Sequence, residues 1–343
     1  ASMQMLAGLL STAPFSLFMG RFGRRSGFIA GAAFAFCGGA ACAVALHAGN
    51  FFLLCIGHMA LGAALACYQY FRFAAAEVVP ERWQPVAISL MLGSGLAAAF
   101  AGPQIFIWTK DYWISAPLAG AYAAISGLSL IGMIPLLLVR RTEDGAKDRP
   151  AGSMSSSLSI LRRPNVCLPI FIGAASQGVM VLLMTSTPLA MIECGFSESL
   201  SGDVIRWHVV AMFGPSFVTG FIIKRYGVAA VIGCGIGLLI LSALVAASGL
   251  SRGHFYIALV LLGIGWNFGF IGATSMLASI VDPEDRAIAQ GANNTVIALF
   301  ATICAFVSGA VVTGPGWAVL SLSALPLLGI AAVAMFLPRL RTA

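Results

Sequence analysis

The stretch Ser16–Arg25, SLFMGRFGRR, ends a long apolar run and brings three arginines into five positions. A related pattern returns in the second half of the chain as Gly220–Gly227, GFIIKRYG. The aligned pairs are Ser16 and Gly220, Arg21 and Arg225, Phe22 and Tyr226, and Gly23 and Gly227. An apolar helix that ends in a short basic turn with glycine, found twice at matching places, predicts a chain of two similar halves.

The composition excludes a water-soluble protein. The 343 residues are 59% hydrophobic and 9% charged, and the mean hydropathy is +0.96. A soluble domain carries about 25% charged residues, so this chain lacks the charge to cover a soluble surface. Long runs without charge favour helices over the alternating strands of a barrel. We therefore predict an all-α protein whose solvent is the lipid bilayer.

The net charge of +7 does not indicate nucleic acid as a partner, because the cations stand at the ends of apolar runs, as the topology of membrane proteins requires. Eight cysteines are scattered along the chain, nearly all of them inside these runs, without a CxxC pattern. We expect neither a metal site nor any other cofactor. The histidines form no HExxH pattern, and no phosphate-binding loop is present, so we predict that the protein is not an enzyme.

Apolar runs of about 18–25 residues predict membrane spans. There are eleven, at 2–20, 27–47, 51–76, 84–108, 117–139, 165–191, 203–223, 228–249, 254–280, 287–312 and 317–337. Five precede and six follow the long polar segment 140–164. Two equal halves would need twelve spans, so we expect that one span is missing before the first residue.

Positive charge divides the connections between these spans into two sets. Alternate loops and the C-terminal tail hold 15 of the 19 Lys and Arg residues. The positive-inside rule then places this set, and the C-terminus, in the cytoplasm. Segment 140–164 is charged and then rich in Gly and Ser, which is typical of a linker. We predict an N-terminal bundle at 1–139 and a C-terminal bundle at 165–343.

These features resemble the major facilitator superfamily, whose loop after the second span reads roughly G-x-x-x-D-R-x-G-R-R. The positions in this chain are Ser16, Gly20, Arg21, Gly23, Arg24 and Arg25. Ser16 replaces the first Gly of the pattern and Gly20 replaces the Asp, which in the family helps to latch the two halves together. The resemblance covers the whole chain and implies a fold of two pseudo-symmetric six-helix bundles that move a small solute.

Further residues repeat between the halves or match the family at gate positions. Loop EVVPER, at 77–82, matches IVDPEDR, at 280–286, and Gly102-Pro103 stands where exporters that exchange substrate for protons carry Gly-Pro. The residues that we predict to act in gating and conformational change are Arg21, Gly23, Arg24, Arg25, Arg82, Gly102, Pro103, Lys224, Arg225, Gly227 and Arg286.

The predicted span 51–76 contains a polar group, YQYFR. Arg72 follows Gln69 by three residues and Tyr68 by four, so the three would share one helix face. Polar residues inside a bilayer are costly and are therefore candidates for function. Arg72 could bind an anionic group with its planar fork. It could also form an ion pair with a neighbouring span or extend to the cytoplasmic interface.

The family resemblance implies that spans 51–76, 165–191 and 254–280 line a central cavity. The remaining substrate-binding candidates are Gln177 and Met184 on the second of these spans, Trp266 and Asn267 on the third, and Gln104 on span 84–108. Aromatic rings supply stacking surfaces and an amide fixes orientation, which favours a substrate with a flat or apolar body. A methionine stripe is also typical of packing.

We predict a secondary active transporter that moves a small organic solute, with an organic anion as the favoured class, by alternating access. One alternative is a proton-coupled exporter of drugs or metabolites, and another is a relative without transport activity that acts as a sensor or assembly partner. Protons are a candidate coupling ion, although no carboxylate lies deep in a predicted span. We expect a monomer in the inner membrane.

Overall fold

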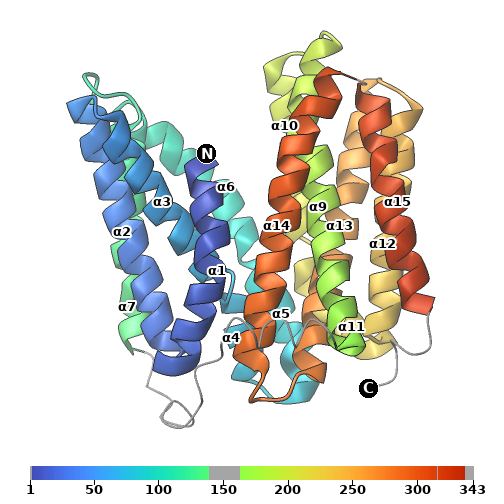
Figure 1. Ribbon diagram of the computed structural model, residues 1–343. Coiled ribbons are helices and arrows are strands. Elements are labelled where there is room, and N and C mark those ends of the chain that lie inside the picture. Colours follow the sequence, from blue (N-terminus) through green and yellow to red (C-terminus); the bar gives the residue numbers. More distant parts are fainter. Residues whose placement is uncertain (1, 139–162, 315, 337–343) are drawn as a thin grey trace. The chain divides into compact units, whose positions relative to one another are not determined.

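The computed structural model describes residues 2–138, 163–314 and 316–336, and within these ranges it contains helices and turns but no strand. Figure 1 shows the helices, which are α1 (Ser2–Phe22), α2 (Arg24–Ala48), α3 (Phe51–Tyr68), α4 (Phe71–Glu77), the 3-10 helix η1 (Glu81–Trp83), α5 (Gln84–Gly93), α6 (Gly95–Thr109), α7 (Ala119–Leu138), α9 (Pro164–Glu193), α10 (Glu198–Phe213), α11 (Ser216–Tyr226), α12 (Val228–Ser248), α13 (Arg252–Ile280), α14 (Arg286–Thr313) and α15 (Trp317–Phe336).

Ten segments in the described part of the chain are long and apolar enough to cross a membrane. They coincide with the ten predicted spans from 27–47 onward. The first predicted span, 2–20, forms α1, which is helical over 21 residues but is not among the ten. Large apolar side chains such as Leu10, Phe51 and Ile131 lie exposed, as expected for helices that face lipid. The prediction of an all-α membrane protein is confirmed.

Three of the ten segments are built from shorter helices. The segment Phe51–Glu77 is interrupted at Gln69–Tyr70, where the Tyr70 N–H bonds to the Cys67 carbonyl, three residues back. A second interruption lies at Ser94, and a third lies at Gly214–Pro215, where proline lacks the N–H that a helix needs. Each segment was predicted as one continuous helix, and the local tightening of the backbone is the reason for the difference.

The helices form two compact units. Unit 1 contains Ala1–Ala74, Ala98–Leu158 and Pro283–Thr295, and unit 2 contains Ala75–Ala97, Ser159–Asp282 and Val296–Ala343. The predicted bundles, 1–139 and 165–343, follow the order of the chain, whereas each unit includes a segment from the other half. The predicted linker 140–164 lies outside the described residues up to position 162, as does the tail from 337.

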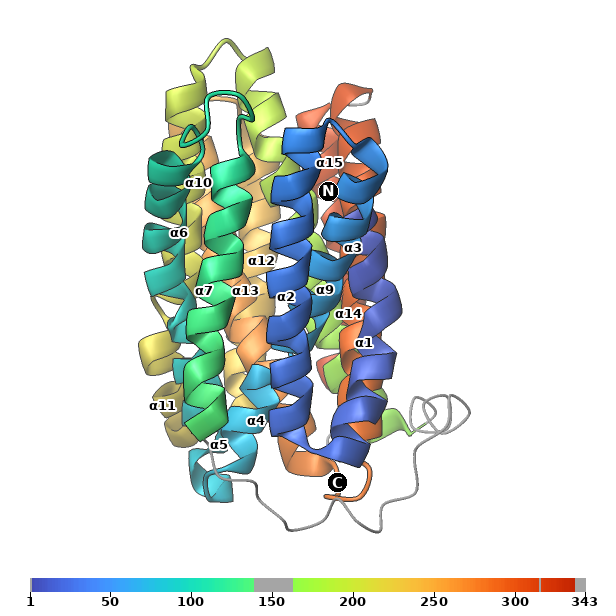
Figure 2. The ribbon, with the colours of Figure 1, turned by 90° about the vertical axis from the view of Figure 1, so that its left-hand side faces the viewer.

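In unit 1, α2 packs against both α3 and α7, and α1 packs against α3, as Figures 1 and 2 show. Glycines permit this close approach. A Cβ atom on Gly38 of α2 would lie 2.8 Å from the Gly57 carbonyl oxygen of α3, and a Cβ on Gly57 would lie 2.9 Å from that of Gly38. Small residues at such contacts are the usual means of helix packing in a bilayer.

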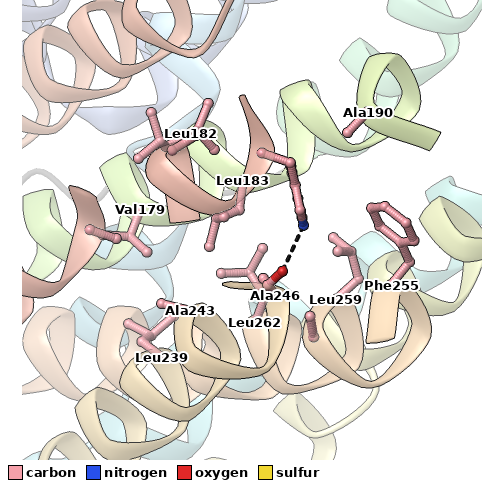
Figure 3. Close-up of a cluster of buried hydrophobic side chains, with 14 of the residues drawn as sticks. Val179, Leu182, Leu183, Ala190, Leu239, Ala243, Ala246, Phe255, Leu259 and Leu262 are labelled. Carbon is pink, nitrogen blue, oxygen red and sulfur yellow. Dashed lines mark hydrogen bonds between the residues drawn. The ribbon is translucent and has the colours of Figure 1, made fainter. Parts of the chain in front are cut away.

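In unit 2, α13 lies among α9, α10 and α12, and α15 packs on α12. Figure 3 shows a buried cluster, here called the main core, in which α9, α12 and α13 contribute aliphatic side chains such as Leu183, Leu239 and Leu262. The dashed line in Figure 3 marks the hydrogen bond that the indole N–H of Trp317 donates to the Ala246 carbonyl at 2.8 Å. This bond satisfies the one polar atom of a buried Trp.

Candidate functional site

An aromatic cluster lies on the α13 side of unit 2. Trp266 and Phe270, one helical turn apart, are stacked with ring centroids 4.9 Å apart, and both are buried. Phe213, at the end of α10, meets the Trp266 ring edge-on at 5.9 Å. Gln177 of α9 accepts the indole N–H of Trp266 at 2.8 Å. Because this bond joins two helices, it holds the indole in one orientation.

Methionines surround these rings. Met180 and Met212 are buried with them, and the half-buried Met184 packs against both this cluster and the main core. The half-buried members, Gln177, Met184 and Phe213, form the accessible edge of the cluster. Thioether side chains adapt their shape to a neighbour, so an edge of this composition can accommodate a flat apolar ring.

Asn267 follows Trp266 in the chain but points into a different environment. Its side chain is fully buried, and its amide donates to the Met212 carbonyl and to the Ser216 hydroxyl, each at 2.6 Å. Its oxygen accepts from the Thr219 hydroxyl at 2.6 Å. These bonds tie α13 to α10 and α11 and engage the amide on both sides. Binding of substrate by Asn267 stays a prediction.

Arg72 of α4 is buried in unit 1, with 5% of its surface exposed. It donates to Gln69 Oε1 at 2.9 Å and to Asn294 Oδ1 at 2.5 Å. The side chain therefore turns into the protein rather than along the helix to the interface. Arg72 and Gln69 meet as predicted, although the helix between them is broken. The third member of the group, Tyr68, instead stacks on Phe71 at 5.7 Å.

Three predicted residues, Gly102, Pro103 and Gln104, lie together on α6. Gln104 lies exposed on α6. Gly102 lies exposed two residues earlier, and a Cβ atom on it would have no neighbour within 4 Å. Pro103 lies within α6. The interruption of this span falls at Ser94 instead. Gly102 does not lie at a close helix contact.

The two basic turns share one backbone conformation. Gly23 has φ 85° and ψ 159°, and Gly227 has φ 86° and ψ 154°. Only glycine adopts this region without strain. In each turn the glycine N–H bonds to the carbonyl four residues earlier, Met19 in the first and Ile223 in the second, at 2.9 and 2.8 Å. The repeat recognised in the sequence is therefore a repeat of structure.

The cations of the first turn contact different partners within unit 1. Arg24 donates to Gln290 Oε1, at the start of α14, and Arg25 donates to the Leu137 carbonyl at 2.7 Å. Arg21 is exposed and lies over the ring of its neighbour Phe22. Arg24 thus reaches the segment that the second half contributes to this unit, and its role in gating stays a prediction.

The second turn has its own contacts in unit 2. Lys224 Nζ lies 3.5 Å from the centroid of Trp83 in η1, a cation–π contact. Arg225 lies over the ring of Tyr226, and Arg82 is exposed. Arg286, the first residue of α14, is half-buried in unit 1. The roles of these residues in gating stay predictions.

Two serine–glycine contacts next to these turns were missed by the sequence analysis. In unit 1, Ser16 donates to the Ala287 carbonyl, and a Cβ on Gly291 would lie 2.7 Å from Ser16 Oγ. In unit 2, Ser89 donates to the Ser216 carbonyl, and a Cβ on Gly220 would lie 2.5 Å from the Pro85 carbonyl oxygen. In both contacts the accepting carbonyl lies four residues before the glycine.

Both contacts join a segment of one half to helices of the other, so local patterns cannot reveal them. The available signal was the alignment of Ser16 with Gly220, two small residues at the same place of the repeat. We name these the Ser16–Gly291 contact and the Ser89–Gly220 contact. The Gly220 N–H also donates to Ser89 Oγ at 2.9 Å, which closes the second contact on both sides.

Two histidines inside the spans are also engaged. His58 of α3 is half-buried, and its Nε2 lies 3.0 Å from the hydroxyl of Tyr122 on α7. His208 of α10 is fully buried, with Nδ1 at 2.7 Å from the Leu259 carbonyl. Among the described residues, no three His, Cys, Asp or Glu side chains gather as a metal site would require.

Comparison with known proteins agrees with this architecture. The model of the Major Facilitator Superfamily matches residues 208–343. The riboflavin transporter RfnT of Brucella anthropi is 36% identical over 338 residues, covering 96% of this chain and 83% of that protein. The uncharacterized MFS-type transporter YdeG of Bacillus subtilis is 31% identical over 317 residues, covering 88% of this chain and 74% of that protein.

A solved structure shares the fold at low identity. The transporter FucP in its outward conformation has a TM-score of 0.83 and 17% identity, covering 100% of this chain and 90% of that one. Ten spanning segments in the described residues, a repeated basic turn and a polar and aromatic interior define a helical membrane transporter. The chain belongs to the Major Facilitator Superfamily, and the prediction of a multi-pass transporter rather than an enzyme is confirmed.

Proposed function

We propose that this transporter carries a flavin-type molecule, a flat heteroaromatic ring with a hydroxylated chain. The observation that carries the proposal is the Trp266–Phe270 stack held by Gln177. A flat ring that stacks on an aromatic side chain gains about 0.5–1.5 kcal/mol beyond the burial of its area. The 36% identical riboflavin transporter supports the same class of substrate.

The accessible edge of the cluster suits such a ring. Phe213 offers a second aromatic face, Met184 fills irregular space, and the amide of Gln177 provides polar atoms beside the indole. Flavins carry carbonyl and ring nitrogen acceptors on one edge and methyl groups on the other. An apolar pocket with a few fixed polar groups is the usual design for a ligand of this kind.

Transport would proceed by alternating access, the mechanism typical of this fold. In this mechanism each unit releases the segment that it holds from the other half, so the Ser16–Gly291 and Ser89–Gly220 contacts open together. We further propose that the protein is a monomer in the cytoplasmic membrane with its C-terminus inside, which the distribution of Lys and Arg supports. The orientation can be tested by fusing the C-terminus to a fluorescent protein that folds only in the cytoplasm. Fluorescence of the fusion supports a C-terminus inside.

A second candidate substrate is an organic anion, which the buried position of Arg72 favours. Proton coupling is a further proposal, for which His58 and its contact with Tyr122 are the candidate group. Comparing transport with and without an imposed pH gradient tests that proposal. The alternative of a proton-coupled exporter rested on Gly102-Pro103, which lies away from the helix interruption at Ser94. The alternative of a sensor without transport activity predicts that no solute moves in any transport assay.

Counterflow in proteoliposomes tests the main proposal, because exchange of labelled for unlabelled riboflavin needs no knowledge of the coupling ion. We expect exchange above that of empty liposomes. Trp266→Leu should raise KM about tenfold, the ratio that ~1.4 kcal/mol of lost stacking corresponds to. Liposomes with the wild-type protein that exchange no riboflavin would overturn the proposal.

Trp317→Leu is the matched control. Trp317 is buried in the same unit and also donates its indole N–H at 2.8 Å, but to the main core. We expect this variant to lose thermal stability and to keep the KM for riboflavin. Equal effects of the two substitutions on KM would show that Trp266 acts only through packing.

A further inference from the structure

The helix α9 has a single open face where it passes the aromatic cluster. Between positions 172 and 187, the residues that are not buried are Gln177, Val181, Met184 and Thr185. Their spacing of four, three and one residues places them on one side of the helix. The opposite side carries Val179, which enters the main core, as Figure 3 shows. Val181 and Met184 pack against the aromatic cluster, so the open face continues from that cluster to Thr185.

Thr185 belongs to a pair of hydroxyl groups that joins α9 to α14 within unit 2. Its Oγ1 donates to the Val181 carbonyl at 2.7 Å and lies 2.9 Å from Ser308 Oγ. Ser308 is buried and also reaches the Ala305 carbonyl at 2.8 Å. Two hydroxyl groups have two hydrogens for these three contacts, so at least one lone pair of Thr185 receives no hydrogen from the pair. Since Thr185 is exposed, a solute can donate a hydrogen bond to that lone pair.

The backbone beside Thr185 supplies a second acceptor. Pro188 lies inside α9 and has no N–H, so it cannot give the Met184 carbonyl the bond that a helix normally provides from four residues on. The Met184 carbonyl and the Thr185 hydroxyl belong to the same helical turn. Residues 171–189 include no charged side chain. Uncharged oxygens suit a neutral donor, such as an alcohol, better than an anion.

We propose that Thr185, positioned by Ser308, binds a hydroxyl group on the chain of the transported solute. The inference rests on the proposed function, which accounted for the flat ring at Trp266 but left the hydroxylated chain without a partner. Eight residues separate Gln177 from Thr185, which corresponds to about 12 Å along the helix. A fused ring with an extended chain can cover that distance. Thr185 would thus distinguish a flavin with its chain from the bare ring.

Thr185→Val is the sharpest test, because valine keeps the branched shape of threonine and removes only the hydroxyl group. Thr187→Val is the matched control. Thr187 lies on the same helix and also donates to the carbonyl four residues earlier, at 2.8 Å, but its side chain is fully buried. Both substitutions remove one bond within α9, and only Thr185→Val changes the open face.

The measurement is counterflow of labelled riboflavin in proteoliposomes with two unlabelled competitors, riboflavin and lumiflavin. Lumiflavin carries the same ring with a methyl group in place of the chain. We expect the wild type and Thr187→Val to prefer riboflavin. Thr185→Val should lower the apparent affinity for riboflavin by about threefold to tenfold, the ratio that one hydrogen bond corresponds to, and leave that for lumiflavin unchanged.

The outcomes separate this inference from the proposed function. A wild-type protein that exchanges no riboflavin overturns the proposed function and this inference with it. If the wild type exchanges riboflavin but Thr185→Val weakens both competitors equally, or weakens neither, the flavin proposal stands and the role of Thr185 is overturned. The same holds if Thr187→Val loses the preference for riboflavin to the same extent.

Should Thr185→Val fail to fold, two other variants test the hydroxyl pair. Thr185→Ser keeps the hydroxyl group and should keep the preference for riboflavin over lumiflavin. Ser308→Ala removes the positioning partner from α14, and we expect it to reduce that preference, because only 3% of Ser308 is exposed and it acts through Thr185. Loss of the preference in Thr185→Ser, or an unchanged preference in Ser308→Ala, would contradict the proposal.

Discussion

Ser16 and Gly220 occupy the same place in the two halves of the chain, and each contacts a helix from the opposite half. In unit 1 the serine is on α1 and the glycine on α14, whereas in unit 2 the glycine is on α11 and the serine on α5. The same contact is therefore built twice with its two residue types exchanged. Two predictions follow from this relationship.

The first concerns Gly220→Ala. Its Cβ would lie 2.5 Å from both the Pro85 carbonyl oxygen and Val86 Cα, which are backbone atoms and cannot rotate away. We expect α11 and α5 to separate locally, with a loss of about 1–3 kcal/mol in stability and a slower counterflow. Unfolding of the purified variant and its exchange rate check this.

Gly237→Ala on α12 is the control, because a Cβ there has no neighbour within 4 Å. Alanine favours a helix by about 0.5–1 kcal/mol over glycine, so this variant should be as stable as the wild type or slightly more stable. A Gly220→Ala protein that behaves like the control would show that the close approach is not needed.

The second prediction tests the exchanged residue types in unit 1. Gly291→Ser alone should impair transport, because its Cβ would meet Ser16 at 2.7–2.8 Å. Gly291→Ser should also lower the stability of the protein. Adding Ser16→Gly places the glycine on α1 and the serine on α14, as the glycine is on α11 and the serine on α5 in unit 2, and should restore most of that stability. A double-mutant cycle on Tm measures the coupling, which we expect to be about 0.5–3 kcal/mol for two residues in contact. Additive effects would contradict the prediction.

The third prediction concerns the basic turns. Gly23→Ala and Gly227→Ala force a side chain into a backbone region that is open to glycine alone, and each should cost of order 1–3 kcal/mol. No atom lies within 4 Å of a Cβ at either position, so strain rather than collision is the cause. Equal decreases in Tm for the two variants would confirm the structural repeat, and a decrease in only one would contradict it.

The fourth prediction concerns Gln177. Gln177→Leu removes the acceptor of the Trp266 indole N–H, leaves a buried donor unpaired and frees the ring to turn. We expect KM for riboflavin to rise about threefold to tenfold with a smaller change in the maximal rate. Gln177→Glu keeps the acceptor and should stay close to the wild type. Counterflow at varied riboflavin concentrations distinguishes these outcomes.

The fold could be predicted because its determinants are local. A run of apolar residues long enough to cross a bilayer is a helix wherever it occurs, and a glycine that follows basic residues ends it. The turns at Gly23 and Gly227 were paired from residue types alone. Their backbone angles agree to within a few degrees.

The candidate site could be predicted only in part, because partners far apart in the chain leave no local pattern. Trp266 was selected for the stacking surface of its ring and Gln177 as a polar residue inside a span, but their hydrogen bond was not foreseen. Arg72 was expected to face an acid or an anion, and its bond to Asn294 joins residues from opposite halves. Asn267 was selected for its amide, and its three hydrogen bonds to α10 and α11 were not foreseen.

Because each unit includes a segment from the other half of the chain, recombination between related genes is restricted. A hybrid gene could join the first half of this transporter to the second half of a relative. In its product, the Ser16–Gly291 contact and the Ser89–Gly220 contact would each be formed by segments from two different parents. Segment 75–97 would meet a foreign α11, and a foreign segment 283–295 would meet α1. Each contact in this chain pairs one serine with one glycine, so we expect recombination at the linker to succeed between parents that place the two residues in the same order.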